Sequence, residues 1–346
     1  MRKLSYIFLS IIFLISCTKQ TKKTLQKGTY RAVLKIQDNQ ELPFIFEVKN
    51  DSLLAIFNAD ETILVDEITY SNDSVRIQTP VFEGYIIAKI EDNFLKGSFI
   101  KTSLDRIVPF EATKNNVRFS SKKESTKNIS GNWETVFNEN SADEKYIAKG
   151  IFNQNGNLVT GTFRTTTGDY RYLEGLVYGD SLKLTTFDGA HAFLFTAKVT
   201  DSTMNGFFYS GNHWKEPFEA KLNNTYELPK ADNLTFIKEG YEDFDFSFPD
   251  TRGRIVSLSD TKFQQKPVII QIMGTWCPNC LDESKFLVNY LRENPNTNIE
   301  VIALAFEVAK TREIAFKRIK RLKERIGIEY PVLLAQYGNS ADKKIA

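Results

Sequence analysis

Cysteine and histidine are scarce in this chain, which has three cysteines and two histidines among 346 residues. Three cysteines cannot build the disulfide framework of a small secreted domain. His191 and His213 lie in a strand-rich region away from the cysteine pair at Cys277 and Cys280, so a closed four-ligand zinc site is not expected. The net charge is only +2, which argues against a nucleic-acid binder that depends on a large basic field.

The apolar stretch at the N-terminus is too short to span a bilayer comfortably. Residues 4–15 follow a positively charged start and have the length of the h-region of a signal peptide. Leu14-Ile15-Ser16-Cys17 resembles a bacterial lipobox, in which the cysteine is lipidated and becomes the mature N-terminus. Residues 1–17 are therefore expected to be a lipoprotein signal peptide. The alternative is an ordinary secretory signal in which Cys17 has no role.

Residues 18–27 are polar and lysine-rich, as expected of a flexible tether. Lipid on Cys17 would anchor the protein to a membrane surface. The sequence thus predicts a bacterial cell-envelope protein that faces the periplasm, at the outer membrane rather than the inner one.

Residues 28–222 have the pattern of antiparallel β structure. Short alternating segments, about eight in residues 28–114 and about eight in residues 131–222, are separated by turn residues. Strands this close together can be joined only by hairpins. Each region is therefore predicted to be an all-β domain, either an eight-strand barrel or a two-sheet sandwich, with residues 115–130 as a linker. Residues 223–240 are predicted to be a second linker.

The two β regions share an internal repeat. Three segments recur at offsets of 107, 109 and 108 residues, so the register hardly changes. A repeat of this length indicates two tandem copies of a domain rather than a solenoid. The paired segments are 73–77 with 180–184, 94–99 with 203–208, and 109–112 with 217–220.

The pattern changes from residue 241 onward to alternating strands and helices. Apolar strands are predicted at 268–273, 299–306 and 332–334, with helical spacing at 281–291 and in the basic segment 309–326. This alternation predicts a parallel sheet. We expect the basic helix to cover the sheet and to expose its charges to solvent.

Cys277 and Cys280 stand at the junction of the first of these strands with its helix. A disulfide-exchange enzyme needs a thiolate nucleophile and a second thiol that resolves the mixed disulfide. Backbone N–H groups and the helix dipole favour a thiolate at Cys277, so we assign it as the nucleophile and Cys280 as the resolving thiol. Pro278 suits the first helical turn, and Trp276 is expected to shield the pair.

Other interpretations of the cysteine pair are less consistent with the sequence. Half of a zinc site would need a second ligand pair, which the histidines do not supply. A fixed structural disulfide in so tight a loop would add little stability by closing it. A redox-active pair fits the position best.

Residues 241–346 resemble the TlpA/ResA-type thioredoxin-like extracytoplasmic disulfide reductases of the AhpC/TSA redoxin group. The resemblance implies a thioredoxin-like fold, and it implies that Glu283, three residues after the second cysteine, is an acid/base group. The alternative for Glu283 is a solvated helix residue. Glu307, at the carboxyl end of the second strand, is a further candidate. The matching segments are 248–250, Gly253, 258–260, 276–280 and Glu283.

The sequence departs from this family in three ways. Asn279 stands where proline is usual, and no proline follows the glutamate, since Ser284 and Lys285 come next. The chain ends at Ala346, before the cis-proline loop, the two further strands and the last helix of the family. The sequence thus predicts a partial thioredoxin-like domain, truncated at its C-terminus.

Together these features predict a membrane-anchored thiol–disulfide oxidoreductase. Its partners would be thiol or disulfide protein substrates and a thiol-protein electron donor, with no nucleic acid. It would use the Cys277–Cys280 disulfide and no bound cofactor, and the resemblance favours reduction. One alternative is a thiol peroxidase, although Thr275 is two residues before Cys277 and a peroxiredoxin needs three. The other is a lipid-anchored binding protein in which the β regions act alone.

Overall fold

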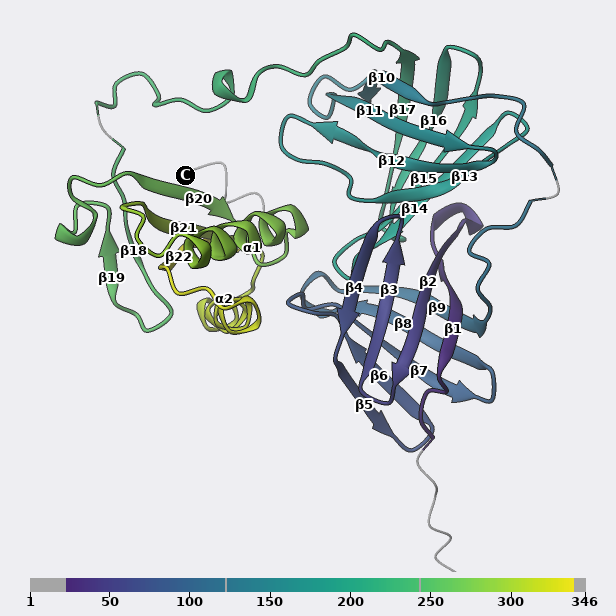
Figure 1. Ribbon diagram of the computed structural model, residues 1–346, viewed down its shortest axis with the longest axis horizontal. Helices are drawn as coiled ribbons and strands as arrows, with labels where there is room; N and C mark the ends of the chain where they lie inside the picture. Colours follow the sequence, from purple (N-terminus) through teal and green to yellow (C-terminus); the bar gives the residue numbers. More distant parts are fainter. Residues whose placement is uncertain (1–22, 122, 243, 339–346) are drawn as a thin grey trace, which may run out of the picture.

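The computed structural model describes residues 23–121, 123–242 and 244–338. Two β barrels lie against each other, and an α/β domain lies beside them, joined to the second barrel by a long exposed segment (Figure 1). The expected signal peptide and the lipidation site at Cys17 fall outside the described residues. Within those residues, no helix combines the length and the apolar character needed to cross a membrane.

The first barrel is one antiparallel sheet of nine strands rather than the eight predicted. Its two edge strands are neighbours in sequence, separated by Asp66 alone, so the sheet curves almost into a closed barrel. In spatial order the strands are β4 (Glu61–Val65), β3 (Leu53–Asn58), β2 (Glu41–Asn50), β1 (Gly28–Lys35), β9 (Arg106–Lys114), β8 (Phe94–Lys101), β7 (Tyr85–Glu91), β6 (Ser74–Gln78) and β5 (Glu67–Ser71).

The second barrel is a closed antiparallel barrel, which was one of the two predicted alternatives, the other being a two-sheet sandwich. Inward-facing side chains alternate along the strands, and the interior is filled by aromatic rings such as Phe163 and Phe195, whose centroids are 4.8 Å apart. Its eight strands are β10 (Gly131–Phe137), β11 (Tyr146–Asn155), β12 (Leu158–Thr165), β13 (Leu173–Tyr178), β14 (Ser181–Phe187), β15 (Ala192–Val199), β16 (Thr203–Ser210) and β17 (Trp214–Leu222).

The two barrels share a packed junction. Phe187 of the second barrel stacks on Phe44 of the first, with ring centroids 4.3 Å apart, and belongs to the first barrel's core. Arg118 is buried there and donates to the Pro43 carbonyl at 3.2 Å and to the Thr185 hydroxyl at 2.9 Å. Residues 115–130, predicted as a linker, thus contribute a buried side chain that fixes one barrel on the other.

The α/β domain has the predicted parallel sheet. Strands β20 (Val268–Met273), β21 (Glu300–Glu307) and β22 (Val332–Tyr337) pair in that order. Helices α1 (Pro278–Glu293) and α2 (Arg312–Ile326) share one hydrophobic core on one face of the sheet. On the other face, a second core includes residues of the hairpin formed by β18 (Ser247–Pro249) and β19 (Ile255–Ser257).

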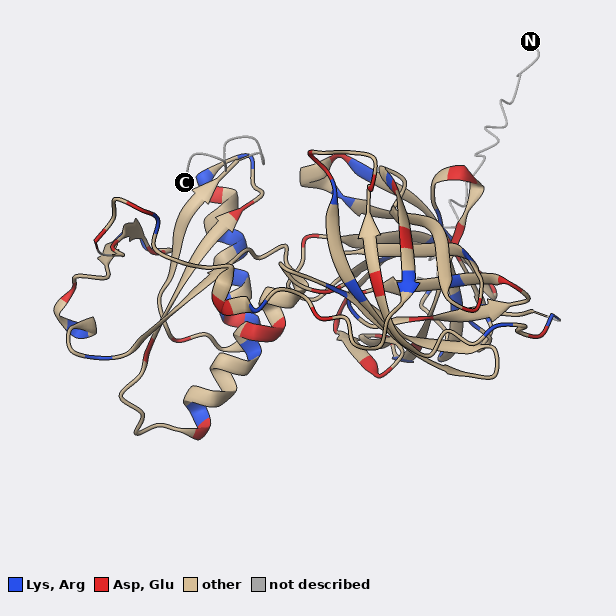
Figure 2. Cartoon of the chain, turned by 90° about the horizontal axis from the view of Figure 1, so that it is seen from above, with Lys and Arg blue, Asp and Glu red and all other residues tan. Residues whose placement is uncertain are grey.

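The α/β domain and the barrels form two lobes that meet over a limited region (Figure 2). The loop between β6 and β7 inserts Val81, only 6% exposed, into the α1/α2 core. Helix α2 turns part of its basic face toward the first barrel, where Arg318 pairs with Glu83 and Arg321 pairs with Glu67 at 2.6 Å. The expectation that this helix exposes its charges to solvent is therefore wrong for this face.

Candidate active site at the Cys277–Cys280 disulfide

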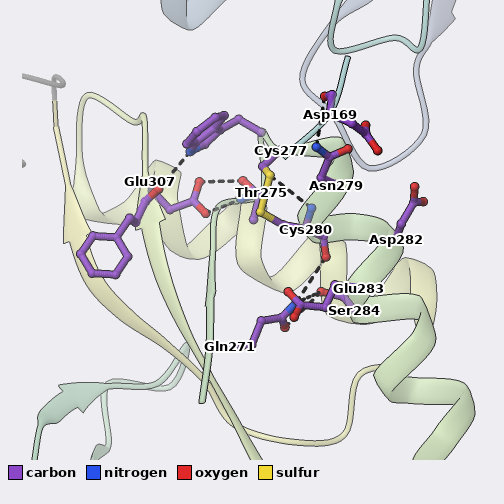
Figure 3. The surroundings of a disulfide bond; sticks show 12 residues. Asp169, Gln271, Thr275, Cys277, Asn279, Cys280, Asp282, Glu283, Ser284 and Glu307 are labelled. Atoms are coloured by element: carbon purple, nitrogen blue, oxygen red, sulfur yellow. Dashed lines mark hydrogen bonds between the residues drawn. A yellow bond between two sulfur atoms is a disulfide. The ribbon is translucent and has the colours of Figure 1, made fainter. Parts of the chain in front are cut away.

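Cys277 and Cys280 form a disulfide at the N-terminus of α1 (Figure 3). Cys277 is the N-cap residue, and its sulfur accepts a hydrogen bond from the backbone N–H of Cys280 at 3.2 Å. Pro278 occupies the first helical turn, where its missing N–H leaves no hydrogen bond unmade. The first-turn N–H groups of a helix stabilise negative charge, so the cap position suits a thiolate.

A buried carboxylate lies on one side of the disulfide. Glu307, at the end of β21, is 0% exposed and accepts hydrogen bonds from the Thr275 backbone N–H at 2.8 Å and the Thr275 hydroxyl at 2.6 Å. These bonds fix the loop that leads into Cys277. The Trp276 indole folds back to donate to the Phe306 carbonyl at 2.9 Å. This placement of the indole requires a glycine at position 274, because a Cβ on Gly274 would lie 2.3 Å from the indole nitrogen.

Below Cys280, a second polar group connects the helix to the sheet. The Gln271 amide of β20 donates to Glu283 at 3.0 Å, to the Ser284 hydroxyl at 3.0 Å and to the Cys280 carbonyl at 3.3 Å. Burial raises the pKa of Tyr330 to about 12, so its hydroxyl stays protonated and can donate to Gln271 at 3.4 Å. Glu283 itself is exposed, and the amide of Gln271 fixes its orientation.

Asn279, between the two cysteines, is in contact with the second barrel. Its side-chain amide donates to the Asp169 carbonyl at 3.2 Å and accepts from the Arg171 guanidinium at 3.2 Å. Gly168 makes this approach possible, because a Cβ there would lie 2.6 Å from the Asn279 amide nitrogen. Arg171 also pairs with Asp282 of α1 at 2.5 Å, so one barrel side chain contacts two residues of this helix.

Arg171 is itself held by acidic side chains of both barrels. Glu61 of β4 pairs with it at 2.6 Å, and the carboxylate of Asp188 lies 3.7 Å from its Nε. Although burial alone would raise the pKa of Asp188, hydrogen bonds and positive charge from His191, followed by Arg171, lower it below its usual value. Asp188 is therefore a buried anion, which compensates the positive charge of Arg171.

The structure brings most of the predicted site residues together. Trp276, Pro278 and Glu283 surround the Cys277–Cys280 disulfide, and Glu307 approaches it through Thr275. The roles assigned to them stay predictions. In the part of the chain that is described, no three His, Cys, Asp or Glu side chains gather as metal ligands would. His191 instead pairs with Asp188 at 3.1 Å.

The sequence analysis did not identify Gln271 or Arg171 as part of the site. Gln271 is one polar residue in the predicted apolar strand 268–273, and that exception could have marked it as a side chain aimed at the helix. Arg171 carried no such signal, because its partners on α1 follow it by more than 100 residues.

Comparison with known proteins supports the assignment of this domain. The AhpC/TSA family model matches residues 240–343. The thiol-disulfide oxidoreductase ResA of Bacillus subtilis (strain 168) is 28% identical over 98 residues, which are 28% of this chain and 50% of that protein. The chain thus matches half the length of this relative.

A solved structure of transferrin binding protein B from Haemophilus parasuis, a vaccine antigen in mutant form, was also found. It covers 57% of this chain and 76% of its own, with 9% identity and a TM-score of 0.18.

Residues 240–343, which carry the disulfide described above, belong to the AhpC/TSA family and are a redoxin domain of the TlpA/ResA type.

Proposed function

We propose that this protein is a thiol–disulfide oxidoreductase that exchanges disulfides with partner proteins through Cys277 and Cys280. The observation that carries the proposal is the placement of the Cys277 sulfur as the N-cap of α1, bonded to the N–H of its own disulfide partner. The similarity of this domain to a thiol-disulfide oxidoreductase supports the same chemistry.

The exchange consists of two displacement steps. In the reduced enzyme, the Cys277 thiolate attacks a substrate disulfide and forms a mixed disulfide, and the displaced substrate thiolate takes up a proton. The Cys280 thiolate then attacks the Cys277 sulfur, which releases the second substrate thiol and forms the Cys277–Cys280 disulfide. Two electrons have passed to the substrate, and a thiol-protein donor restores the dithiol by the reverse exchange.

Glu283 is proposed as the acid/base group of these proton transfers. It lies one helical turn after Cys280, and the Gln271 amide orients its carboxylate at 3.0 Å. Glu283→Gln should reduce the rate of disulfide reduction by about 100-fold and flatten its pH profile. Lys285→Gln is a matched control on the exposed face of α1. An unchanged pH profile in Glu283→Gln would leave Glu283 as a solvated helix residue.

The two cysteines can be tested by comparing Cys277→Ser with Cys280→Ser. Cys277→Ser should abolish the reduction of insulin or of a model disulfide, because no nucleophile remains. Cys280→Ser should accumulate mixed disulfides on Cys277, detected by mass spectrometry, because nothing resolves them. Accumulation on Cys280 in the Cys277→Ser protein would reverse the two roles, and reductase activity that survives in both variants would refute the proposal. Peroxide turnover that depends on Cys277, without disulfide reduction, would instead indicate a thiol peroxidase.

The lipid anchor and the extracytoplasmic location are part of the proposal. The support is the apolar segment 4–15, whose last two residues begin the motif Leu14-Ile15-Ser16-Cys17. Cys17→Ala should release the protein from the membrane fraction, and mass spectrometry of the wild-type N-terminus should find acyl chains on Cys17. A wild-type protein with a free thiol at Cys17 would contradict the anchor.

We also infer that the two barrels are tandem copies of one domain. An aromatic residue of the first strand in each barrel donates to the carbonyl four residues earlier: Tyr30 to Gln26 at 3.0 Å and Trp133 to Ile129 at 2.9 Å. Tyr30 and Trp133 are 103 residues apart, a slightly shorter offset than the 107 to 109 residues of the other paired segments, and the matched hydrogen bond supports a common origin of the two first strands. Related sequences in which the two regions do not keep a common offset would contradict the duplication.

A further inference from the structure

A cavity of about 610 Å³ lies where the two barrels meet the redoxin domain. It borders Trp276, the residue before the nucleophilic cysteine, and most of its wall comes from the barrels. Its volume falls within the range of about 300 to 1,000 Å³ that is typical of small-molecule sites. The redox chemistry proposed above assigns no role to the barrel residues of this wall.

One part of the cavity wall is aromatic. Three aromatic side chains of the second barrel line it: Tyr170, Phe193 and Phe208. The ring centroid of Phe208 lies 5.0 Å from that of Tyr170 and 5.1 Å from that of Phe193. Trp214 and Trp276 border the same cavity and are 41% and 42% exposed. Large aromatic surfaces left open to solvent around a cavity are typical of a ligand site.

Another part of the wall is positively charged. Lys101 ends β8 and donates to the Ala190 carbonyl at 2.9 Å, and Arg106 begins β9. Among the described residues, neither has a carboxylate within ion-pair distance, whereas most arginines at the domain junctions have one. Burial, followed by the charge of Arg106, lowers the pKa of Lys101 to about 8, so the lysine is still cationic at pH 7.

The acidic side chains of the cavity already have partners. Glu83 pairs with Arg318, and the Glu216 carboxylate accepts hydrogen bonds from Asn138 at 2.5 Å and from Tyr146. Neither carboxylate forms an ion pair with Lys101 or Arg106, although Glu83 and the nearby Asp188 lie close enough to attract Lys101. A partly buried cation without a counter-ion is costly, and an anionic ligand would offset that cost.

We propose that this cavity is a binding site for a small amphipathic anion, a molecule with an aromatic or aliphatic body and one anionic group such as a carboxylate or sulfonate. The body packs between the aromatic side chains, and the anionic group lies between Lys101 and Arg106. A ligand bound there contacts Trp276, the residue next to Cys277. This site is independent of the disulfide exchange, which needs only the two cysteines and their partners.

The proposal can be tested with the anionic fluorophore 8-anilinonaphthalene-1-sulfonate and the uncharged N-phenyl-1-naphthylamine, added to the intact protein. The anionic probe should bind at one saturable site and more tightly than the uncharged probe. Lys101→Gln and Arg106→Gln should each lower the affinity for the anionic probe about 10-fold, because each removes one charge-assisted contact. The affinity for the uncharged probe should not change. Lys96→Gln, an exposed lysine of the same strand β8, is the matched control.

Affinity for the anionic probe should also fall as the pH rises through about 8, because Lys101 loses its proton there. Lys101→Gln should remove this pH dependence. The charged and titratable groups that act on Lys101 are Glu83, Arg106, Asp188, His213 and Arg318, and His191 and Glu216 also line the cavity.

Several outcomes would overturn the proposal. They are binding that does not saturate, equal affinity for both probes, or the same loss in Lys96→Gln as in Lys101→Gln and Arg106→Gln. If Lys101→Gln alters the near-UV circular dichroism of the barrels, Arg106→Gln decides the matter by itself. Arg106 begins β9, and within the described residues its side chain makes no hydrogen bond or ion pair that the substitution would break.

Discussion

The barrels and the redoxin domain use buried polar groups in different places. In the redoxin domain these groups lie beside the disulfide, where Gln271, Ser284 and Glu307 are 0–2% exposed. In the barrels they lie at the junctions, where Arg118 is 5% exposed and the side chain of Arg171 is 6% exposed. Burying a polar group is costly unless it is hydrogen-bonded, so each cluster marks a place where geometry matters. In the redoxin domain, the buried polar groups fix the residues around the disulfide. In the barrels, they fix one barrel on the other and the redoxin domain on the barrels.

The cores of the two parts differ as well. The second barrel is filled by large rings, and the α1/α2 core of the redoxin domain contains several alanines, among them Ala303, Ala305 and Ala315. A closed barrel of rings loses many contacts when one ring is removed. We therefore expect the barrels to be more stable than the redoxin domain and to act as its scaffold.

The largest effect is expected from Phe195→Ala in the centre of the second barrel. Phe195 is fully buried, with ring centroids 4.8 Å from both Phe163 and Phe208. Its removal should lower the free energy of unfolding by about 3–5 kcal/mol in urea titrations followed by circular dichroism. Phe207→Ala, on a residue 41% exposed, is the control and should cost less than about 1 kcal/mol. Equal losses in the two variants would contradict the contrast between the cores.

The next effect is expected at the contact between the barrel and the redox motif. Arg171→Gln leaves Glu61, Asp188 and Asp282 without their common cation, which should cost about 3 kcal/mol. Because Arg171 and Asp169 hold Asn279, the redoxin domain should then separate from the barrels. Small-angle X-ray scattering should show a larger radius of gyration, and trypsin should cleave the exposed segment 227–242 faster.

Two further variants sharpen this test. Gly168→Ala should have a smaller effect in the same direction, because its Cβ would displace the Asn279 amide while Arg171 keeps its carboxylate partners. Arg164→Gln, an exposed arginine of β12, should change neither measurement. A compact Arg171→Gln protein would show that the contacts of Val81 and of the α2 arginines with the first barrel are enough to hold the domains together.

Local patterns in the sequence were sufficient to predict the three parallel strands and the two helices of the redoxin domain, but not the hairpin of β18 and β19. The strand at 268–273 is observed with those limits, and the helix predicted from the spacing of 281–291 spans Pro278–Glu293. Alternation and turn residues likewise predicted antiparallel β domains. The count of eight strands was wrong for the first barrel, because β3, β4 and β5 are separated by only one or two residues, with little turn sequence to mark each end.

Contacts between domains could not be predicted in this way. Arg321 and its partner Glu67 are 254 residues apart, and nothing near either residue identifies the other. The basic segment 309–326 was therefore interpreted as solvated, since a charged helix face is compatible with water and with an acidic neighbour alike. The role of Asn279 was missed for the same reason, as its partners come from the β12–β13 connection.

The smallest effect is expected at the exposed end of α2. Arg325 pairs with Asp66 at 2.6 Å, but the two side chains are 31% and 52% exposed, so Arg325→Gln should cost less than about 1 kcal/mol and less still at high salt. Lys320→Gln, which faces solvent on the same helix, is the control.

The Arg325–Asp66 pair should also respond to acid in a defined direction. The hydrogen bond from Arg325 lowers the pKa of Asp66 below its usual value of 3.8, so the contribution of the pair is complete above that pH and is lost as the pH falls below it. Urea titrations of wild type and Arg325→Gln should therefore differ slightly at pH 7 and converge below pH 3.8. A loss in Arg325→Gln as large as that in Arg171→Gln would mean that exposed charges hold the domains as firmly as buried ones, and the contrast drawn here between exposed and buried contacts would fail.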